Sequence, residues 1–174
     1  AQKKGIDIYS LGNGVELEKH GIKVKGTIRD LLKKCDIVVD CAPKPYGAQN
    51  IEELYKPMKV KAIIQGGEKA GAAQVSFVAQ CNYDDAIGKD YVRVVSCNTT
   101  GLCRSIHALD KIFGVVKARA TLIRRGGDPA NVTRGPINSI VPSFELPSHH
   151  GPDVRSVLPE MEVFTTAVIV PKTL

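Results

Sequence analysis

Helical stripes that alternate with short β-branched runs constrain the fold most strongly. After Thr27, which can cap a helix, apolar residues recur at helical spacing: Ile28, Leu31, Leu32 and Cys35. The run 36–41 follows and has the composition of a buried parallel strand. A second stripe over 51–58 leads to a strand over 59–64, and a further strand is expected over 91–95. This order of helices and strands predicts an α/β fold.

The chain from Ser96 onward has a different pattern. Residues 115–125 alternate between two faces, which predicts a half-exposed strand in an antiparallel type of sheet. The segment 126–159 is rich in Gly, Pro and Ser and has little periodicity, so we expect a loop that is functional or supported by short local elements. A last strand is expected over 164–170. We therefore predict a boundary between two portions near Ser96.

The composition fits a globular protein and narrows its partners. The 174 residues are 43% hydrophobic, which is enough for a sizeable core. The net charge of +6 comes from basic residues scattered among acidic ones, and 5% of the residues are aromatic, which argues against a nucleic-acid partner. No apolar run approaches the roughly 20 residues of a membrane span, so we expect no membrane partner.

The cysteines indicate a reducing compartment. Their number is odd, their spacing is irregular and no CxxC pair occurs, so the sequence suggests neither a disulfide framework nor a zinc site. We therefore expect free thiols, no bound metal and a cytoplasmic location. Four of the cysteines are expected to be small apolar core residues: Cys35, Cys41, Cys81 and Cys103.

Cys97 stands at a junction that can activate a thiol. The strand over 91–95 delivers it to the first turn of a helix, whose apolar residues recur at helical spacing before a glycine stop: Leu102, Ile106, Leu109, Phe113 and Gly114. Free backbone N–H groups and the helix dipole favour an anion at that turn, and the thiolate is the reactive form of cysteine. Cys97 is the candidate nucleophile, and the alternative is a small buried core residue.

Two residue pairs downstream of Cys97 suit an anionic substrate. Arginine, present as Arg124 and Arg125, binds carboxylate or phosphate with two hydrogen bonds. Histidine, present as His149 and His150, transfers protons near neutral pH. The alternative for the arginines is solvent-facing charge, and adjacent strand residues point to opposite faces, so at most one can reach a shared site. No further ligand lies at metal-binding spacing from the histidines, which disfavours a metal site.

Two loops follow predicted strands and are candidate cofactor contacts. They cover residues 43–47 and 65–69, at the carboxyl ends of strands, where open α/β sheets bind their ligands. The alternative for Gly66 and Gly67 is a strand end that needs glycine for steric reasons alone.

Several segments together resemble one enzyme family. The nonapeptide SCNTTGLCR at 96–104 is similar to the active-site signature of archaeal-type phosphorylating glyceraldehyde-3-phosphate dehydrogenase. Segments with the same order and approximate spacing resemble that family too: 40–44, 65–69, 124–126 and 147–153. The resemblance implies a Rossmann-like dinucleotide-binding portion over residues 1–95, followed over 96–174 by an α+β catalytic portion with a mainly antiparallel sheet.

The resemblance also implies an activity and roles for residues. The activity is the phosphorylating, NAD(P)-dependent oxidation of D-glyceraldehyde 3-phosphate to 1,3-bisphosphoglycerate, in glycolysis or gluconeogenesis, by a homotetramer. Cys97 would form a thiohemiacetal and then a thioester, which inorganic phosphate cleaves. The implied substrate contacts are Ser96, Asn98, His150 and Gly151, with His149 and Arg124 near the phosphates. The implied dinucleotide contacts are Gly67 and Arg125.

Some parts of the family pattern are expected outside this sequence. The glycine-rich GxGxxG turn would precede Ala1, together with the residue that separates NAD from NADP. The general-base histidine would follow Leu174, so the 174 residues alone are expected to be inactive. Two alternatives remain open: another cysteine-dependent semialdehyde dehydrogenase, and a non-catalytic fragment that acts as a binding or assembly module.

Overall fold

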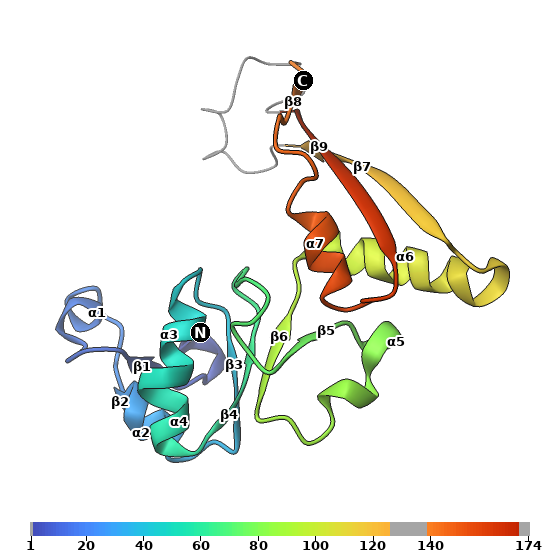
Figure 1. Ribbon diagram of the computed structural model, residues 1–174. Coiled ribbons are helices and arrows are strands. Elements are labelled where there is room, and N and C mark those ends of the chain that lie inside the picture. The colour runs from blue at the N-terminus through green and yellow to red at the C-terminus, as the bar shows by residue number, and fades with distance from the viewer. Residues whose placement is uncertain (1, 126–138, 171–174) are drawn as a thin grey trace. The chain divides into compact units, whose positions relative to one another are not determined.

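The computed structural model describes residues 2–125 and 139–170, and the chain divides into two compact units (Figure 1). Unit 1 comprises Ala1–Glu68, Ala72–Gln74 and Lys89–Arg93. Unit 2 comprises Lys69–Gly71, Val75–Gly88 and Val94–Leu174. The division into residues 1–95 and 96–174 stays a prediction.

Unit 1 is built on parallel strands. The strands β3 (Ile37–Asp40), β4 (Lys61–Ile64) and β6 (Tyr91–Val94) lie next to one another in that order, and both pairings are parallel. The connection from β3 to β4 contains a continuous helical run, the usual form of a parallel crossover: α3 (Tyr46–Asn50), the π-helical turn η2 (Ile51–Tyr55) and α4 (Lys56–Met58). The predicted α/β fold is confirmed in this unit.

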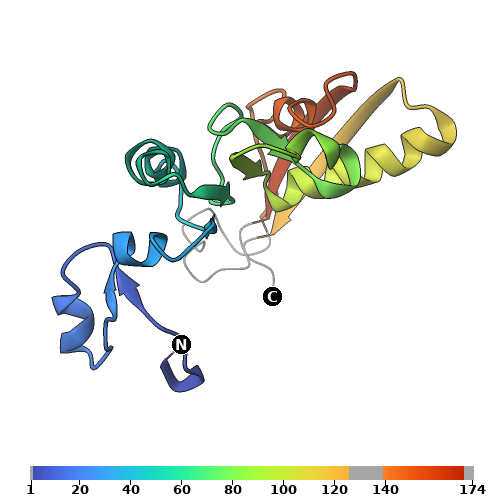
Figure 2. The same cartoon turned by 90° about the horizontal axis from the view of Figure 1, so that it is seen from below.

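The N-terminal part of unit 1 is a small parallel pair with helices. Its elements are η1 (Gln2–Lys4), β1 (Tyr9–Ser10), α1 (Val15–Lys19), β2 (Gly26–Thr27) and α2 (Ile28–Leu32). Figure 2 shows α2 beside β1 and β2. Thr27 caps α2 with its side chain, and the Asp30 carboxylate accepts from the Thr27 backbone N–H, which completes a capping box. The predicted Thr27 cap is confirmed.

The core of unit 1 lies between the sheet and the helical crossover. Its buried members are Leu32, Ile51, Tyr55, Val60, Ala62 and Ile64. The prediction of a buried strand over 36–41 is wrong for its middle, because Ile37 and Val39 are 53% and 55% exposed. Within the described residues β3 pairs with β4 alone, and β-branched composition reports strand preference rather than burial.

Unit 2 contains the longest helix of the described residues. Helix α6 (Cys97–Phe113) begins after the N-cap Ser96 and ends at Gly114, whose φ of 69° is in the left-handed region that glycine adopts readily. The predicted helix and its glycine stop are confirmed. Shorter elements precede it: β5 (Val75–Phe77), α5 (Ala79–Asn82) and η3 (Asp84–Ala86).

The sheet of unit 2 corrects one prediction. Strand β7 (Lys117–Arg125) pairs in parallel with β9 (Glu162–Val170) along its whole length, and only the short β8 (Val141–Pro142) pairs antiparallel with β9. The expected mainly antiparallel sheet is therefore a mixed sheet whose long pair is parallel. The alternation of exposed and half-buried residues in β7 is confirmed. The alternation of residues along β7 indicates which face of the strand is covered. The direction of the pairing depends instead on the connection from β7 to β9.

The return from β7 to β9 includes short local elements. Helix α7 (His150–Arg155) and β8 lie in its described part, as expected for a segment of low periodicity, while residues 126–138 lie outside the described residues. In unit 2, α7 contacts both α6 and β9 (Figure 1). This return brings the 147–153 segment beside the first turns of α6.

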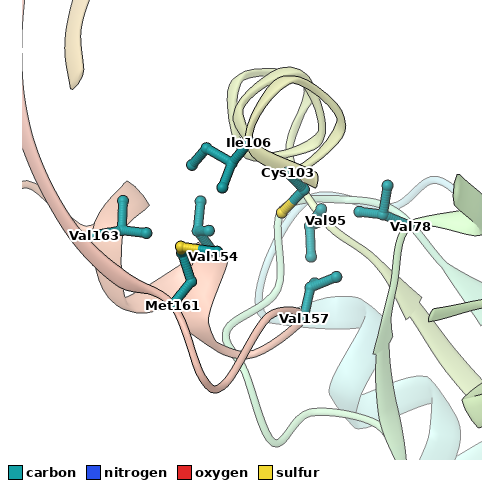
Figure 3. Close-up of a cluster of buried hydrophobic side chains, with 8 residues drawn as sticks. All are labelled: Val78, Val95, Cys103, Ile106, Val154, Val157, Met161 and Val163. Atoms are coloured by element: carbon teal, nitrogen blue, oxygen red, sulfur yellow. The ribbon is translucent and has the colours of Figure 1, made fainter. Parts of the chain in front are cut away.

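One apolar cluster holds these elements of unit 2 together (Figure 3). Its buried members are Val78, Val95, Cys103, Ile106, Val154, Val157, Met161 and Val163. The Cys103 thiol is fully buried, and burial raises its pKa to about 12, so it is a neutral core group. The expected structural role of Cys103 is confirmed.

Candidate active site

Cys97 is the first residue of α6 and is exposed to solvent. The alternative of a small buried core residue is therefore excluded for Cys97. Strand β6 and Val95 precede the helix, and the Ser96 side chain accepts from the Thr99 backbone N–H at 3.3 Å as an N-cap. The local sequence thus builds a rigid junction with an accessible thiol in the first helical turn.

The other cysteines differ from their prediction in one case. Cys35 and Cys81 are half-buried, and burial raises the pKa of the Cys81 thiol. Cys41, which was expected in the core, is exposed, and the Gln65 amide nitrogen lies 2.9 Å from its sulfur. Cys41 ends up exposed because it directly follows β3, in the loop at the strand's carboxyl end.

His150 is the buried histidine of the pair and faces α6. It is 2% exposed at the start of α7, and the Asn98 amide nitrogen lies 3.5 Å from its Nε2 atom. His149 is exposed, and its ring lies 3.9 Å from that of His150 between centroids. Asn98 and His150 are 52 positions apart in the chain, so the fold alone brings them together.

A buried hydroxyl network sets the orientation of His150. The Thr165 hydroxyl donates to the Ser148 carbonyl at 3.0 Å, and the Gly151 N–H donates to the Thr165 oxygen at 2.9 Å. The Ser148 hydroxyl, 2.8 Å from the Thr165 oxygen, then donates to it and accepts from His150 Nδ1 at 3.3 Å. This network places the proton on Nδ1 and leaves the Nε2 lone pair toward Asn98.

The electrostatics keep His150 neutral. The pKa of His150 is lowered to about 4, mainly by burial and also by the nearby His149 and Arg124, while Asp153 and Glu145 oppose the shift. Near neutral pH the imidazole is therefore a hydrogen-bonding group rather than a cation. Positive charge at this site comes from Arg124.

Arg124 and Arg125 are adjacent at the end of β7, and the structure describes the side chain of Arg124 alone. Arg124 shares the half-buried face of β7 with Ala118, Ala120 and Leu122, and its charge acts on His150. Arg125 pairs through its backbone with Val170, and its side chain lies outside the described residues, as does Gly126. The sequence prediction that one arginine reaches the site is consistent with Arg124.

Two of the predicted substrate contacts already have structural partners. The Gly151 N–H bonds to Thr165, and a Cβ at Gly151 would lie 3.1 Å from the Val163 carbonyl oxygen, so this position is packed. The Ser96 hydroxyl lies 3.0 Å from the Thr99 hydroxyl. Contacts with substrate stay predictions for Ser96, Asn98, His149, His150, Gly151 and Arg124.

The candidate dinucleotide loop lies in unit 1. Gly67 follows β4 with a φ of +87°, and nothing lies within 4 Å of a Cβ built there, so the backbone is open to a ligand. This open glycine at a strand's carboxyl end fits a dinucleotide phosphate or ribose. Its contact with a cofactor stays a prediction.

Sequence reasoning missed the polar residues that support the site. Ser148, Thr165 and Thr99 are at most 2% exposed. Thr165 carried a signal, because it shares the inward face of β9 with the buried residues Val163 and Ala167. A hydroxyl at an inward position of a strand needs a partner, which makes it a candidate for a polar network.

Neither a metal cluster nor a membrane helix occurs in the part of the chain that the structure describes. No group of three or more His, Cys, Asp or Glu side chains is placed to hold a metal ion there. Over residues 2–125 and 139–170, no helix is both long and apolar enough to cross a membrane.

The second half of the chain matches a known domain family. Residues 96–174 match the family model of the glyceraldehyde 3-phosphate dehydrogenase C-terminal domain. That match begins at the N-cap of α6 and includes the Cys97, Asn98 and His150 positions.

Relatives extend the match to the rest of the chain. Glyceraldehyde-3-phosphate dehydrogenases from Methanococcoides burtonii and Methanothermus fervidus are 54% and 53% identical, and each comparison covers 100% of this chain and 52% of the relative. The enzyme of that name from Metallosphaera sedula is 49% identical with the same coverage. The chain is thus similar over its whole length to archaeal glyceraldehyde-3-phosphate dehydrogenases and matches their C-terminal domain over residues 96–174, and it spans about half the length of the curated relatives it matches.

Proposed function

We propose that this chain carries the catalytic cysteine of a glycolytic or gluconeogenic dehydrogenase that oxidises D-glyceraldehyde 3-phosphate to 1,3-bisphosphoglycerate. The observation that carries the proposal is the exposed Cys97 in the first turn of α6, inside the domain that matches the dehydrogenase family. The relatives bear the name of that dehydrogenase. An accessible thiol at a helix N-terminus suits nucleophilic attack on an aldehyde.

Cys97 performs the covalent chemistry in this proposal. Its sulfur bonds to the aldehyde carbon and the carbonyl oxygen takes up a proton, which gives a thiohemiacetal. Oxidation then converts this thiohemiacetal to a thioester. NAD or NADP, when bound, would accept the hydride that leaves the adduct. A phosphate oxygen then attacks the acyl carbon, the carbon–sulfur bond breaks, and the Cys97 thiolate leaves. The sulfur is both a good nucleophile and a good leaving group, so both halves proceed through it.

Residues near Cys97 bind different parts of the substrate in this proposal. Arg124 supplies positive charge for a phosphate, because arginine pairs with phosphate oxygens through two parallel hydrogen bonds. His150 is neutral and does not compete with Arg124 for the phosphate, and a substrate hydroxyl would donate to its Nε2 lone pair in place of the long contact with Asn98. Asn98 offers an amide N–H beside it.

The cofactor, the assembly and the compartment belong to the same proposal. Gly67 and Arg125 would contact the dinucleotide. The open space at Gly67 supports this proposal, because it leaves room for the ligand. The proposed assembly is a homotetramer, measurable as the native mass in solution. All five cysteines are free thiols, which supports a reducing, cytoplasmic compartment.

The test has an activity arm and a labelling arm. The parent protein is mixed with glyceraldehyde 3-phosphate, phosphate and NAD or NADP, and reduced nicotinamide is followed by absorbance. Turnover should vanish in Cys97→Ser and persist in Cys35→Ser, where a hydroxyl can keep the bond to the Leu31 carbonyl. Undiminished turnover of Cys97→Ser would contradict the mechanism. Higher activity toward aspartate semialdehyde would favour the alternative dehydrogenase.

The labelling arm requires no turnover. Iodoacetamide alkylates both exposed thiols, Cys41 and Cys97, and peptide mass spectrometry quantifies each separately. Glyceraldehyde 3-phosphate should slow alkylation of Cys97 and leave Cys41 unaffected. Equal rates at Cys97 with and without the substrate would favour a non-catalytic binding or assembly module.

A further inference from the structure

The geometry points to Thr99 and Asp153 as positioning residues that lock the first turns of α6 and α7 together and so place Asn98 against His150. The inference rests on the proposed function in one respect, since the site it concerns is the proposed catalytic site. Neither residue is a candidate substrate contact. Their role concerns how the site is assembled.

A direct hydrogen bond joins the two helices at these residues. The Thr99 hydroxyl donates to the Asp153 carboxylate at 2.8 Å, across 54 positions of the chain. Thr99 is fully buried and Asp153 is half-buried, so the bond is shielded from solvent on the α6 side. Hydrogen bonds to an ionised group are roughly twice as strong as neutral ones.

The direction of the Thr99–Asp153 hydrogen bond determines which groups donate and accept at the N-cap of α6. A carboxylate accepts, so the Thr99 proton is committed to Asp153. The Ser96 hydroxyl, 3.0 Å from the Thr99 oxygen, must then donate to it, while the Ser96 oxygen accepts from the Thr99 backbone N–H. The chain of donors therefore runs from Ser96 through Thr99 to Asp153. Cys97 lies between two members of this chain in sequence.

The same turns carry the functional pair. Asn98 and Thr99 are adjacent in the first turn of α6, and His150 and Asp153 are three residues apart on α7, which puts them on neighbouring positions of one helix face. The polar contacts that join the two turns include Asn98 to His150 at 3.5 Å and Thr99 to Asp153 at 2.8 Å, and the apolar cluster of unit 2 packs the same two helices.

The two contacts differ in strength. The Asn98 contact is at the long limit of a hydrogen bond and involves neutral groups, so it cannot hold the helices in register by itself. The Thr99 contact is short and includes a carboxylate. It follows that the Thr99 bond sets the register and that the Asn98 contact depends on it. A shift of one ångström between such groups can cost a hundredfold in rate.

The experiment compares three substitutions in the full chain. Thr99→Val removes the hydroxyl and keeps the shape, and Thr99→Ser keeps the hydroxyl. Thr100→Val is the matched control, because the Thr100 hydroxyl donates to the nearby Val95 carbonyl and not, among the described residues, to α7. The main measurement is the nitrogen-15 NMR signal of the His150 imidazole in the folded protein. Thermal unfolding is recorded for each variant.

Thr99→Val should shift the His150 imidazole signals, while Thr99→Ser and Thr100→Val should leave them at the wild-type positions. A residue that only stabilised the fold would lower the unfolding temperature without moving those signals, and that result would overturn the inference. If Thr99→Val does not fold, Thr99→Ala is measured instead, with Thr100→Ala as its control. Unchanged His150 signals in Thr99→Ala would overturn the inference as well.

An activity arm separates this inference from the proposed function. In a preparation that turns over glyceraldehyde 3-phosphate, Thr99→Val should lower kcat about tenfold or more and leave KM within about twofold, with recovery in Thr99→Ser. A change in KM alone would contradict positioning of the reacting groups. If wild-type protein shows no turnover and no substrate protection of Cys97, the proposed function fails, and the NMR arm still decides the role of Thr99 and Asp153.

Discussion

Gly66 lies against the backbone of Ala42 so closely that a Cβ built on Gly66 would be 1.6 Å from the Ala42 carbonyl oxygen. The Lys44 N–H also donates to the Gly66 carbonyl at 3.3 Å. The loops that follow β3 and β4 are therefore pressed together at the carboxyl ends of their strands, where the sequence predicts dinucleotide contacts. The close packing at Gly66 supports the alternative that this strand end needs glycine for steric reasons. Gly67, in contrast, has no atom within 4 Å of a Cβ built on it.

Substitution of these two glycines should separate packing from ligand binding. Gly66→Ala forces a backbone clash and should destabilise unit 1 by about 3 kcal/mol, at the upper end of overpacking effects. Gly67→Ala meets no atom but places a side chain at a φ of +87°, which should cost about 1–2 kcal/mol. Urea unfolding measures both changes.

Cofactor binding gives the second readout for Gly67. Gly71 is the matched control, because it has a φ of +88° and equally open space. Gly67→Ala should weaken NAD or NADP binding measured by calorimetry, while Gly71→Ala should not. Equal affinities in the two variants would remove Gly67 from the cofactor site.

Tyr55 is predicted to stabilise unit 1 through Asp40. Its hydroxyl donates to the buried Asp40 carboxylate at 2.7 Å, beside donors from Asn50 at 2.8 Å and the Ala42 N–H at 2.7 Å. Tyr55→Phe should lower the free energy of unfolding by about 1.5–3 kcal/mol, the range for hydrogen bonds to charged groups. The exposed Tyr83 provides the control, since Tyr83→Phe should change it by less than about 0.5 kcal/mol.

The contribution of Tyr55 to stability should depend on pH in the alkaline range. Burial, followed by the bond to Asp40, raises the pKa of Tyr55 above its ordinary value. A group with a raised pKa in the folded state contributes stability below its unfolded pKa of about 10, and this contribution is lost as the pH rises beyond it. Unfolding midpoints of wild type and Tyr55→Phe should therefore converge above about pH 10. A constant gap through that range would refute the assignment.

His150 should make the protein sensitive to acid. Its pKa is lowered to about 4 in the folded state, so its neutral form contributes fully above the unfolded value of 6.5, and the contribution disappears as the pH falls from 6.5 to 4. The loss should be at most about 3 kcal/mol. Urea midpoints of wild type and His150→Gln, compared at pH 7 and pH 5, isolate it from other groups. An NMR titration midpoint of His150 near 6.5 would contradict the prediction.

Thr165 should be more important for stability than its neighbour on β9. Thr165→Val removes the hydroxyl that accepts from the Gly151 N–H and donates to the Ser148 carbonyl. It should lower the free energy of unfolding by about 1–3 kcal/mol, because buried polar groups lose their partners. Thr166→Val removes only the 3.0 Å contact with the exposed Thr121 and should cost less than about 0.5 kcal/mol. Urea unfolding compares the two, and similar losses would show that the network around His150 carries no special weight.

The sequence alone predicted the elements around Cys97, because their signals are local. The strand that leads to Cys97, the apolar repeat of α6 and the stop at Gly114 are each encoded by residues close to one another in the chain. The two faces of β7 were predictable for the same reason, since they follow from the pleat. The resemblance to a family predicted the substrate and cofactor contacts, and those roles stay predictions.

Only the tertiary structure decided how those elements meet. The parallel pairing of β7 with β9 depends on a long return of the chain, which no alternation of residues encodes. The exposure of Ile37, Val39 and Cys41 depends on what packs beside β3 and its following loop. The bonds of Thr99 to Asp153 and of Ser148 to Thr165 join positions 54 and 17 apart. Such contacts form only when the core of unit 2 brings α6, α7 and β9 together, so local sequence patterns could not reveal them.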